Sequence, residues 1–150
     1  MRRSVIVAVR SSVVGLVAGT AAAAAWAALV IQTGTLFDVL APGIGVAVGV
    51  AMRIAMARGP KGAPLTESDG RTLGFVAGLV TLVSVLGGKI AFLSALLERH
   101  FGDAATWEAI RAPFFTSLIG IRGLYLLIAV VAAYGIAANG AKIDRGAGSD

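Results

Sequence analysis

Two cations interrupt apolar stretches of the sequence, and they are the residues best placed to do chemistry in a nonpolar environment. Lys89 follows seventeen uncharged residues, Thr72–Gly88, and precedes eight more. Arg122 interrupts the apolar run Phe114–Ala138. A cation deep in hydrocarbon costs about 2.5–3.5 kcal/mol on insertion scales, and it normally faces a protein interior or water. Both cations therefore need a carboxylate, a bound anion or a lipid phosphate nearby.

Counter-ions for these cations must come from the helix ends, because no carboxylate lies in the middle of an apolar segment. Asp38 and Glu98 are the candidates. The first hypothesis is that both cations extend toward the membrane surface and pair with Asp38 or Glu98. The second is a small cationic pocket, Lys89 with Arg122, that opens to the outer face and binds an anion or a lipid phosphate. The third is a pair with another subunit.

Four segments are apolar and long enough, at about 20 residues, to cross a membrane as helices. The chain has 150 residues, of which 57% are hydrophobic and 14% charged, whereas a soluble domain carries about 25% charge. The alternation of a membrane barrel strand is absent. We therefore expect an all-α integral membrane protein, a four-helix bundle that forms one domain over residues 1–150. The predicted helices span about residues 13–31, 39–57, 67–97 and 114–138.

Lysine and arginine residues predict how the chain is threaded. Two of them, Arg99 and Arg111, flank one side of the predicted helices. The other side holds nine: Arg2, Arg3, Arg10, Arg53, Arg58, Lys61, Arg71, Lys142 and Arg145. By the positive-inside rule, both termini are cytoplasmic in a multi-pass protein of the bacterial inner membrane. Anionic lipids on the cytoplasmic side are the expected contacts of these cations, and nucleic acid is not an expected partner.

The start of the chain has two interpretations. A basic beginning, an apolar core and A-x-A sites are also typical of a secretory signal, and cleavage near Ala25 would leave three helices. The apolar run continues to Ile31, which favours an uncleaved first helix. Farther along, Thr66 to Asp69 forms a capping-box pattern, so the third helix is expected to start at about Glu67. Residues 103–111 fit a short interfacial helix or an ordinary turn.

Glycine spacing predicts where helices pack closely. Residues four apart share a helix face, and small ones let two backbones approach. Three predicted helices carry such pairs: Gly15 and Gly19, Gly45 and Gly49, and Gly74 and Gly78. Packing within the bundle is the favoured interpretation, and a homo-oligomer through at least one face is the alternative. Four short helices bury little surface, so we expect a homo-oligomer or a partner membrane subunit.

Several kinds of chemistry have no residues to support them. The chain has no cysteine and one histidine, which leaves no thiolate or multi-histidine metal site and no haem ligand pair. No helix carries a central carboxylate for a proton relay, and no serine stands in a G-x-S-x-G context. We therefore expect no enzymatic activity, no metal and no cofactor.

The segment "GIGVAVGVAMRIAMAR", followed by a Gly/Pro hinge and "LGFVAGLVTLVSVLGGKIAF", resembles a family of uncharacterised bacterial membrane proteins. That family has an I-G-x-x-V-G-x-x-x-R helix and a later apolar helix that ends in a G-K-aromatic element. The matching positions, within residues 36–97, are Gly45, Gly49, Arg53, Gly88 and Lys89. The sequence departs from the pattern at Ile90, where the family has an aromatic residue. The resemblance implies a membrane location and no activity.

These observations favour a small scaffold or accessory subunit of a membrane assembly, with self-association as a further expectation. The alternative is a small oligomeric anion channel or transporter that uses Lys89 and Arg122. The two differ in one structural expectation. A scaffold predicts paired cations and buried glycine faces, whereas a channel predicts cations that face a water-filled cavity.

Overall fold

The computed structural model describes residues 2–33, 38–57, 66–97 and 104–143 of the chain. These residues form an all-helical fold and contain no strand. The elements are α1 (Arg2–Thr33), a 3-10 turn η1 (Asp38–Leu40), α2 (Ala41–Ala57), α3 (Glu67–Leu96), α4 (Ala104–Thr116) and α5 (Ile121–Ile143).

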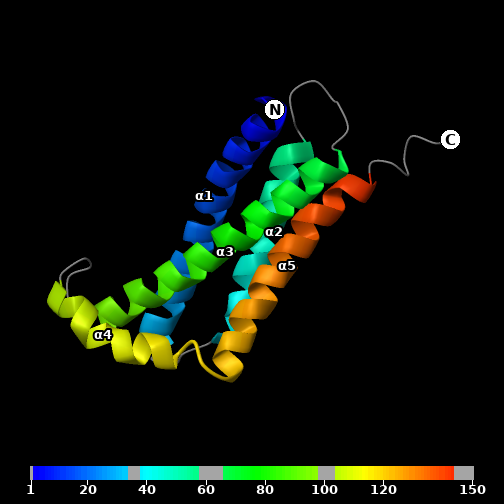
Figure 1. Ribbon diagram of the computed structural model, residues 1–150. Coiled ribbons are helices and arrows are strands. Elements are labelled where there is room, and N and C mark those ends of the chain that lie inside the picture. The colour runs from blue at the N-terminus through cyan, green and yellow to red at the C-terminus, as the bar shows by residue number, and fades with distance from the viewer. Residues whose placement is uncertain (1, 34–37, 58–65, 98–103, 144–150) are drawn as a thin grey trace.

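The four long helices lie side by side and alternate in direction along the chain (Figure 1). α3 packs against α1, α2 and α5, and α2 also packs against α1 and α5. α1 and α5 therefore lie on opposite sides of the α2–α3 pair. α4 crosses one end of the structure, which we call the α4 end, and the start of α1 and the end of α5 lie at the opposite end (Figure 1).

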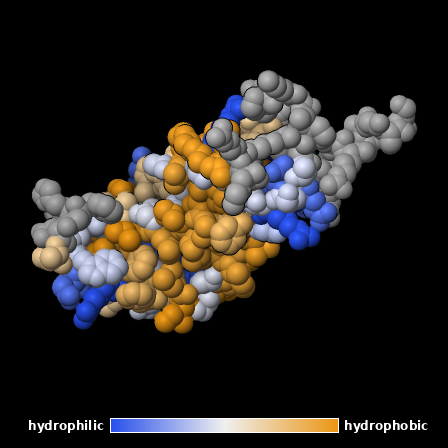
Figure 2. Space-filling model, turned by 45° about the horizontal axis from the view of Figure 1, so that its top comes forward, coloured by the Kyte–Doolittle hydropathy of each residue, from blue (hydrophilic) through white to orange (hydrophobic). Residues whose placement is uncertain are grey.

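Within the described ranges, four helices are long and apolar enough to cross a membrane. Their candidate spans are Ala8–Thr33, Asp38–Met56, Glu67–Ala95 and Ile121–Asn139. Figure 2 shows the same property on one face, where hydrophobic side chains cover the middle and hydrophilic ones gather toward both ends. Such a surface matches a hydrocarbon layer between two aqueous sides. The fold is therefore compatible with a membrane protein.

The start of α3 is fixed by local hydrogen bonds at Thr66. The Thr66 hydroxyl accepts a bond from the backbone N–H of Asp69, and the Asp69 carboxylate accepts one from the backbone N–H of Thr66. This is the capping box that the sequence predicts, and it satisfies two N–H groups that lack a partner at a helix start. An ion pair between Arg71 and Glu67 adds to the first turn.

The boundaries of α4 and α5 differ from the prediction. The short helix predicted at 103–111 extends over Ala104–Thr116, and the fourth long helix begins at Ile121 instead of residue 114. Residues 114–138 read as one apolar run, but Gly120 has a φ of 72°, a left-handed conformation that ends a helix. A Cβ at Gly123 would overlap the carbonyl oxygen of Leu118, so the turn also lies tightly on α5.

α1 is longer than the predicted helix at 13–31. It begins at Arg2 and continues for 32 residues to Thr33. The prediction followed apolar residues only, whereas a helix can extend past the hydrocarbon layer because its backbone hydrogen bonds are internal. α5 likewise extends beyond its predicted end at residue 138 and reaches Ile143, for the same reason.

Close helix packing occurs at the glycine pair of α2, Gly45 and Gly49. A Cβ at Gly45 would overlap the carbonyl oxygen of Ala129 in α5, and one at Gly49 would lie 3.0 Å from the carbonyl oxygen of Ala133. Ala129, Ala133 and Ala137 are fully buried. Small residues on both helices thus bring the backbones of α2 and α5 into contact.

The other two glycine pairs also face neighbouring helices within the chain. A Cβ at Gly15 would lie 2.7 Å from the sulfur of Met52 in α2, and one at Gly19 would overlap the hydroxyl of Ser84 in α3. On the other side of α3, Gly74 lies against Tyr134 and Ala138 of α5, and Gly78 lies against Val130 of the same helix. All three pairs therefore lie at contacts between helices of the same chain.

The α2–α5 contact gives a direct test of this packing. Gly45→Ala should lower the free energy of unfolding by about 1–3 kcal/mol, because the new methyl group would push α2 away from Ala129. Titration with SDS, followed by circular dichroism, measures this loss. Gly43→Ala in the same helix is the matched control, since no atom lies within 4 Å of a Cβ added there. Equal effects of the two substitutions would contradict the close approach.

Candidate functional site

The candidate site is a cluster of charged residues at the α4 end, and its centre is the carboxylate of Asp38. Asp38 is the first residue of η1, directly before α2, and its side chain is only 6% exposed. A negative charge at this position interacts favourably with the N-terminal end of a helix dipole. Pro42, the second residue of α2, fits the first turn because its missing N–H would have no partner there.

Lys89 reaches this carboxylate from α3. Its Nζ lies 3.1 Å from Oδ1 of Asp38, and its side chain is 4% exposed. The ammonium also donates to the backbone carbonyl of Ser117 at 3.1 Å and to the Ser117 hydroxyl at 3.4 Å. An ammonium has three N–H donors. Three groups of the same chain therefore surround the Lys89 charge.

Arg122 reaches the same carboxylate from α5. Its Nε lies 3.4 Å from Oδ2 of Asp38, and its side chain is 46% exposed. The sequence placed Arg122 eight residues inside a helix that begins at Phe114. The structure corrects this position, because Arg122 is the second residue of α5, directly after the turn at Gly120. Arg122 therefore stands at the helix start, where its guanidinium is half open to the surroundings.

Both contacts of Asp38 are ion pairs by distance, but neither meets hydrogen-bond geometry. Coulomb attraction acts in every direction, so the buried Lys89 ammonium at 3.1 Å still attracts the carboxylate strongly, whereas water weakens the attraction of the half-exposed Arg122 at 3.4 Å. The formal charges of Asp38, Lys89 and Arg122 sum to one excess positive charge. Because Lys89 is buried and Arg122 is half exposed, this excess is accessible at Arg122.

Ser117 completes the cluster, although the sequence analysis predicts no role for it. It follows the last residue of α4, and its hydroxyl donates to the carbonyl of Phe114 at 2.7 Å. This bond holds the hydroxyl oxygen and the neighbouring carbonyl toward Lys89. The only signal in the sequence is a serine close to a predicted helix start, which packing serines share. The second counter-ion candidate, Glu98, lies outside the described residues.

The chemistry of this site is neutralisation of charge in a nonpolar environment. Among the described residues, no group of three His, Cys, Asp or Glu side chains could hold a metal ion. The chain matches no protein-family model, and no curated protein and no solved structure matches it.

The shared carboxylate predicts an order of stability among three variants. Asp38→Asn should lower the free energy of unfolding by about 3–5 kcal/mol, because it leaves the buried Lys89 charge unpaired. Lys89→Met should cost less, since Asp38 keeps Arg122. Arg122→Gln should cost less than about 1 kcal/mol, because an exposed ion pair contributes little.

Unfolding in SDS measures all three variants and the double variant Asp38→Asn/Lys89→Met. The double variant removes both buried charges, so it should be more stable than Asp38→Asn alone. If Asp38→Asn were no worse than Arg122→Gln, the carboxylate would not be the common partner of the two cations.

Proposed function

We propose that this protein is a non-enzymatic scaffold or accessory subunit of an assembly in the bacterial cytoplasmic membrane. In this proposal it is a four-helix bundle with both termini in the cytoplasm, and α4 lies at the outer surface. Membership of the family of uncharacterised membrane proteins, through Gly45, Gly49, Arg53, Gly88 and Lys89, is part of the same proposal.

The observation that carries the proposal is the pairing of Lys89. Its ammonium contacts Asp38 and two oxygens of Ser117, and its side chain is 4% exposed. A cation that binds a transported anion needs a free donor and access from water. Lys89 has groups of its own chain at each of these contacts, so its position supports a structural role.

Exposed apolar surface on the outer helices supports a role in assembly. Only 28% of the residues in the apolar window of α1 are buried, and 17% in that of α5, against 50% in α3. α1 and α5 therefore present most of their surface to the surroundings. In a membrane this surface contacts lipid or helices of other proteins, where packing and interhelical hydrogen bonds drive association.

A small oligomeric anion channel or transporter is the second candidate. The observation that favours it is Arg122, which is 46% exposed and carries the excess positive charge of the cluster. If several copies surrounded a pore, their Arg122 side chains could attract anions to its entrance.

Labelling of single cysteines tests the topology, since the chain has no native cysteine. Ser68→Cys at the start of α3 should react with an impermeant maleimide only after the inner membrane is opened. Ala109→Cys in α4 should react in spheroplasts, because α4 lies at the outer surface in this proposal. Both residues are exposed in the structure. The reverse pattern would contradict cytoplasmic termini.

Native purification and liposome flux separate the two candidate functions. A scaffold should co-purify with a stable partner subunit and should give no chloride flux in liposomes. A channel should give chloride flux that falls at least tenfold in Arg122→Gln, with Arg111→Gln as a matched control on α4. Chloride flux that depends on Arg122, without a co-purifying partner, would contradict the scaffold proposal.

A further inference from the structure

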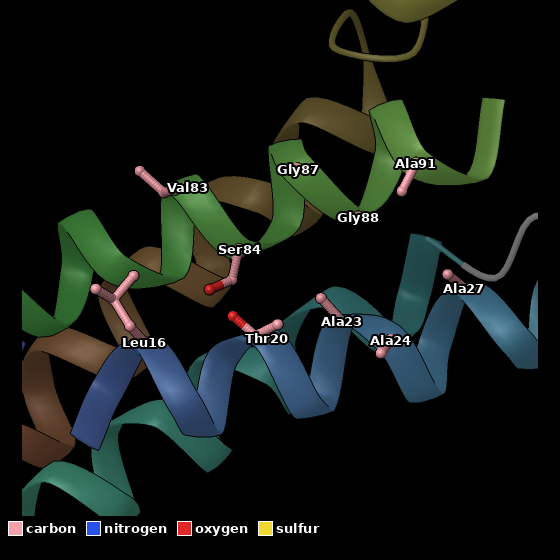
Figure 3. Close-up of a pocket in the computed structure, with 10 residues that line it drawn as sticks. All are labelled: Leu16, Thr20, Ala23, Ala24, Ala27, Val83, Ser84, Gly87, Gly88 and Ala91. Atoms are coloured by element: carbon pink, nitrogen blue, oxygen red, sulfur yellow. The ribbon is translucent and has the colours of Figure 1, made fainter. Parts of the chain in front are cut away.

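Two polar features at the surface of the structure differ in what their own neighbours supply. A groove between α1 and α3 is lined mostly by small residues, and its two hydroxyls, those of Thr20 and Ser84, point toward one another (Figure 3). The charged cluster at the α4 end instead holds one carboxylate, that of Asp38, between two cations. The hydroxyls of the groove therefore face each other, whereas the cluster has an unbalanced charge at its surface.

The guanidinium of Arg122 has hydrogen-bonding capacity that the described residues leave unused. A guanidinium carries five N–H donors in a planar fork. Its ion pair joins Nε to Oδ2 of Asp38 at 3.4 Å without hydrogen-bond geometry, and none of its donors bonds an acceptor among the described residues. The side chain is also 46% exposed. The fork can therefore bind an acceptor that comes from outside the chain.

The carboxylate of Asp38 must compensate more positive charge than the two cations alone. The η1 turn, which begins at Asp38, contacts both α2 and α5, and the N-terminal ends of both helices lie at the α4 end. A helix N-terminus carries a partial positive charge and favours anions over cations. Arg122, the second residue of α5, adds to this positive potential. The cluster therefore attracts a second anion at Arg122.

The surface beside the guanidinium is apolar. Ile119 and Ile121 are 74% and 68% exposed, the highest values among the large hydrophobic side chains that the structure describes. Leu124, in the first turn of α5, is exposed as well. A dissolved anion would leave these side chains in water. A phospholipid carries its phosphate directly beside hydrocarbon, so its headgroup can lie on Arg122 while its acyl chains cover the isoleucines.

We propose that Arg122 binds the phosphate group of an anionic phospholipid at the α4 end. A phosphodiester carries one negative charge, which equals the excess positive charge of the cluster. Two of its oxygens can accept parallel N–H bonds from a guanidinium, and such charge-assisted pairs are among the stronger hydrogen bonds. Lys89 keeps its partners within the chain and does not contact the lipid.

This inference rests on the membrane location in the proposed function and deepens it by naming a lipid partner. In the proposed topology the α4 end lies at the outer surface. The site is therefore on the opposite side from the cytoplasmic cations, for which the sequence predicts contact with anionic lipids. It depends on one arginine beside a shared carboxylate, and not on a large number of cations.

Native mass spectrometry of the full-length chain tests the site, with an equal mixture of phosphatidylglycerol and phosphatidylcholine that carry the same acyl chains. The wild type should bind phosphatidylglycerol in preference. Arg122→Gln should lower this affinity about 5- to 10-fold, because it removes the cation that faces the lipid. Arg111→Gln is the matched control and should bind as the wild type does. It removes one cation from α4 at the same end, but Arg111 is already paired with Glu108.

Lys89→Met separates the excess charge from the simple exposure of an arginine. Without Lys89, the one carboxylate of the cluster is left to Arg122 and the formal charges cancel. The affinity for phosphatidylglycerol should therefore fall about threefold or more, although the lysine side chain is buried. Circular dichroism of each variant shows whether it is folded, and Arg122→Gln alone decides the outcome if Lys89→Met is not.

A wild-type preference for phosphatidylglycerol in Arg122→Gln, or in folded Lys89→Met, would overturn the inference. Inorganic phosphate in excess distinguishes the two sources of a phosphate group. It should not displace the lipid, and displacement that depends on Arg122 would assign the site to dissolved phosphate instead. Failure of the scaffold has a different signature, because the lipid is measured on the purified chain. A chain that binds phosphatidylglycerol through Arg122 but co-purifies with no partner supports this inference and contradicts the scaffold.

Discussion

The shared carboxylate of Asp38 is the interaction on which the α4 end of this structure depends. It lies within 3.4 Å of two cations that come from different helices, Lys89 of α3 and Arg122 of α5. A buried charge without a partner is far less favourable than a paired one. The three segments must therefore meet at this point, and their meeting also fixes the turn at Ser117, whose oxygens face Lys89.

Away from the charged cluster, the helices pack closely because glycine and alanine residues allow their backbones to approach. α2 and α5 touch through Gly45 and Gly49 on one side and three buried alanines on the other. In the proposed lipid environment there is little hydrophobic gain from bringing two apolar helices together, so close van der Waals contact and hydrogen bonds supply the stability. The ion pairs set which ends meet, and the small residues set how closely the helices run.

The sequence was sufficient for the helical class, the four apolar helices, the start of α3 and the candidates for the cluster, because composition and caps are local properties. It could not decide between Asp38 and Glu98, since that choice depends on how helices pack in space. Ser117 carried no signal, because its role comes from a backbone carbonyl that any residue has. The sequence did not predict the start of α5, because a glycine in a left-handed conformation, Gly120, does not interrupt the apolar pattern of residues 114–138.

In the proposed membrane location, the ion pair between Asp38 and Lys89 has a consequence for insertion of the chain into a bilayer. It joins η1, which directly precedes α2, to α3, and because α2 and α3 are consecutive and antiparallel, both charges belong to a single helical hairpin. A hairpin that enters as one unit carries Lys89 already neutralised, and the insertion cost of a lone lysine is reduced. Arg122 is synthesised later and joins a carboxylate that is already in place. The order of residues along the chain thus matches the order in which the charges can be paired.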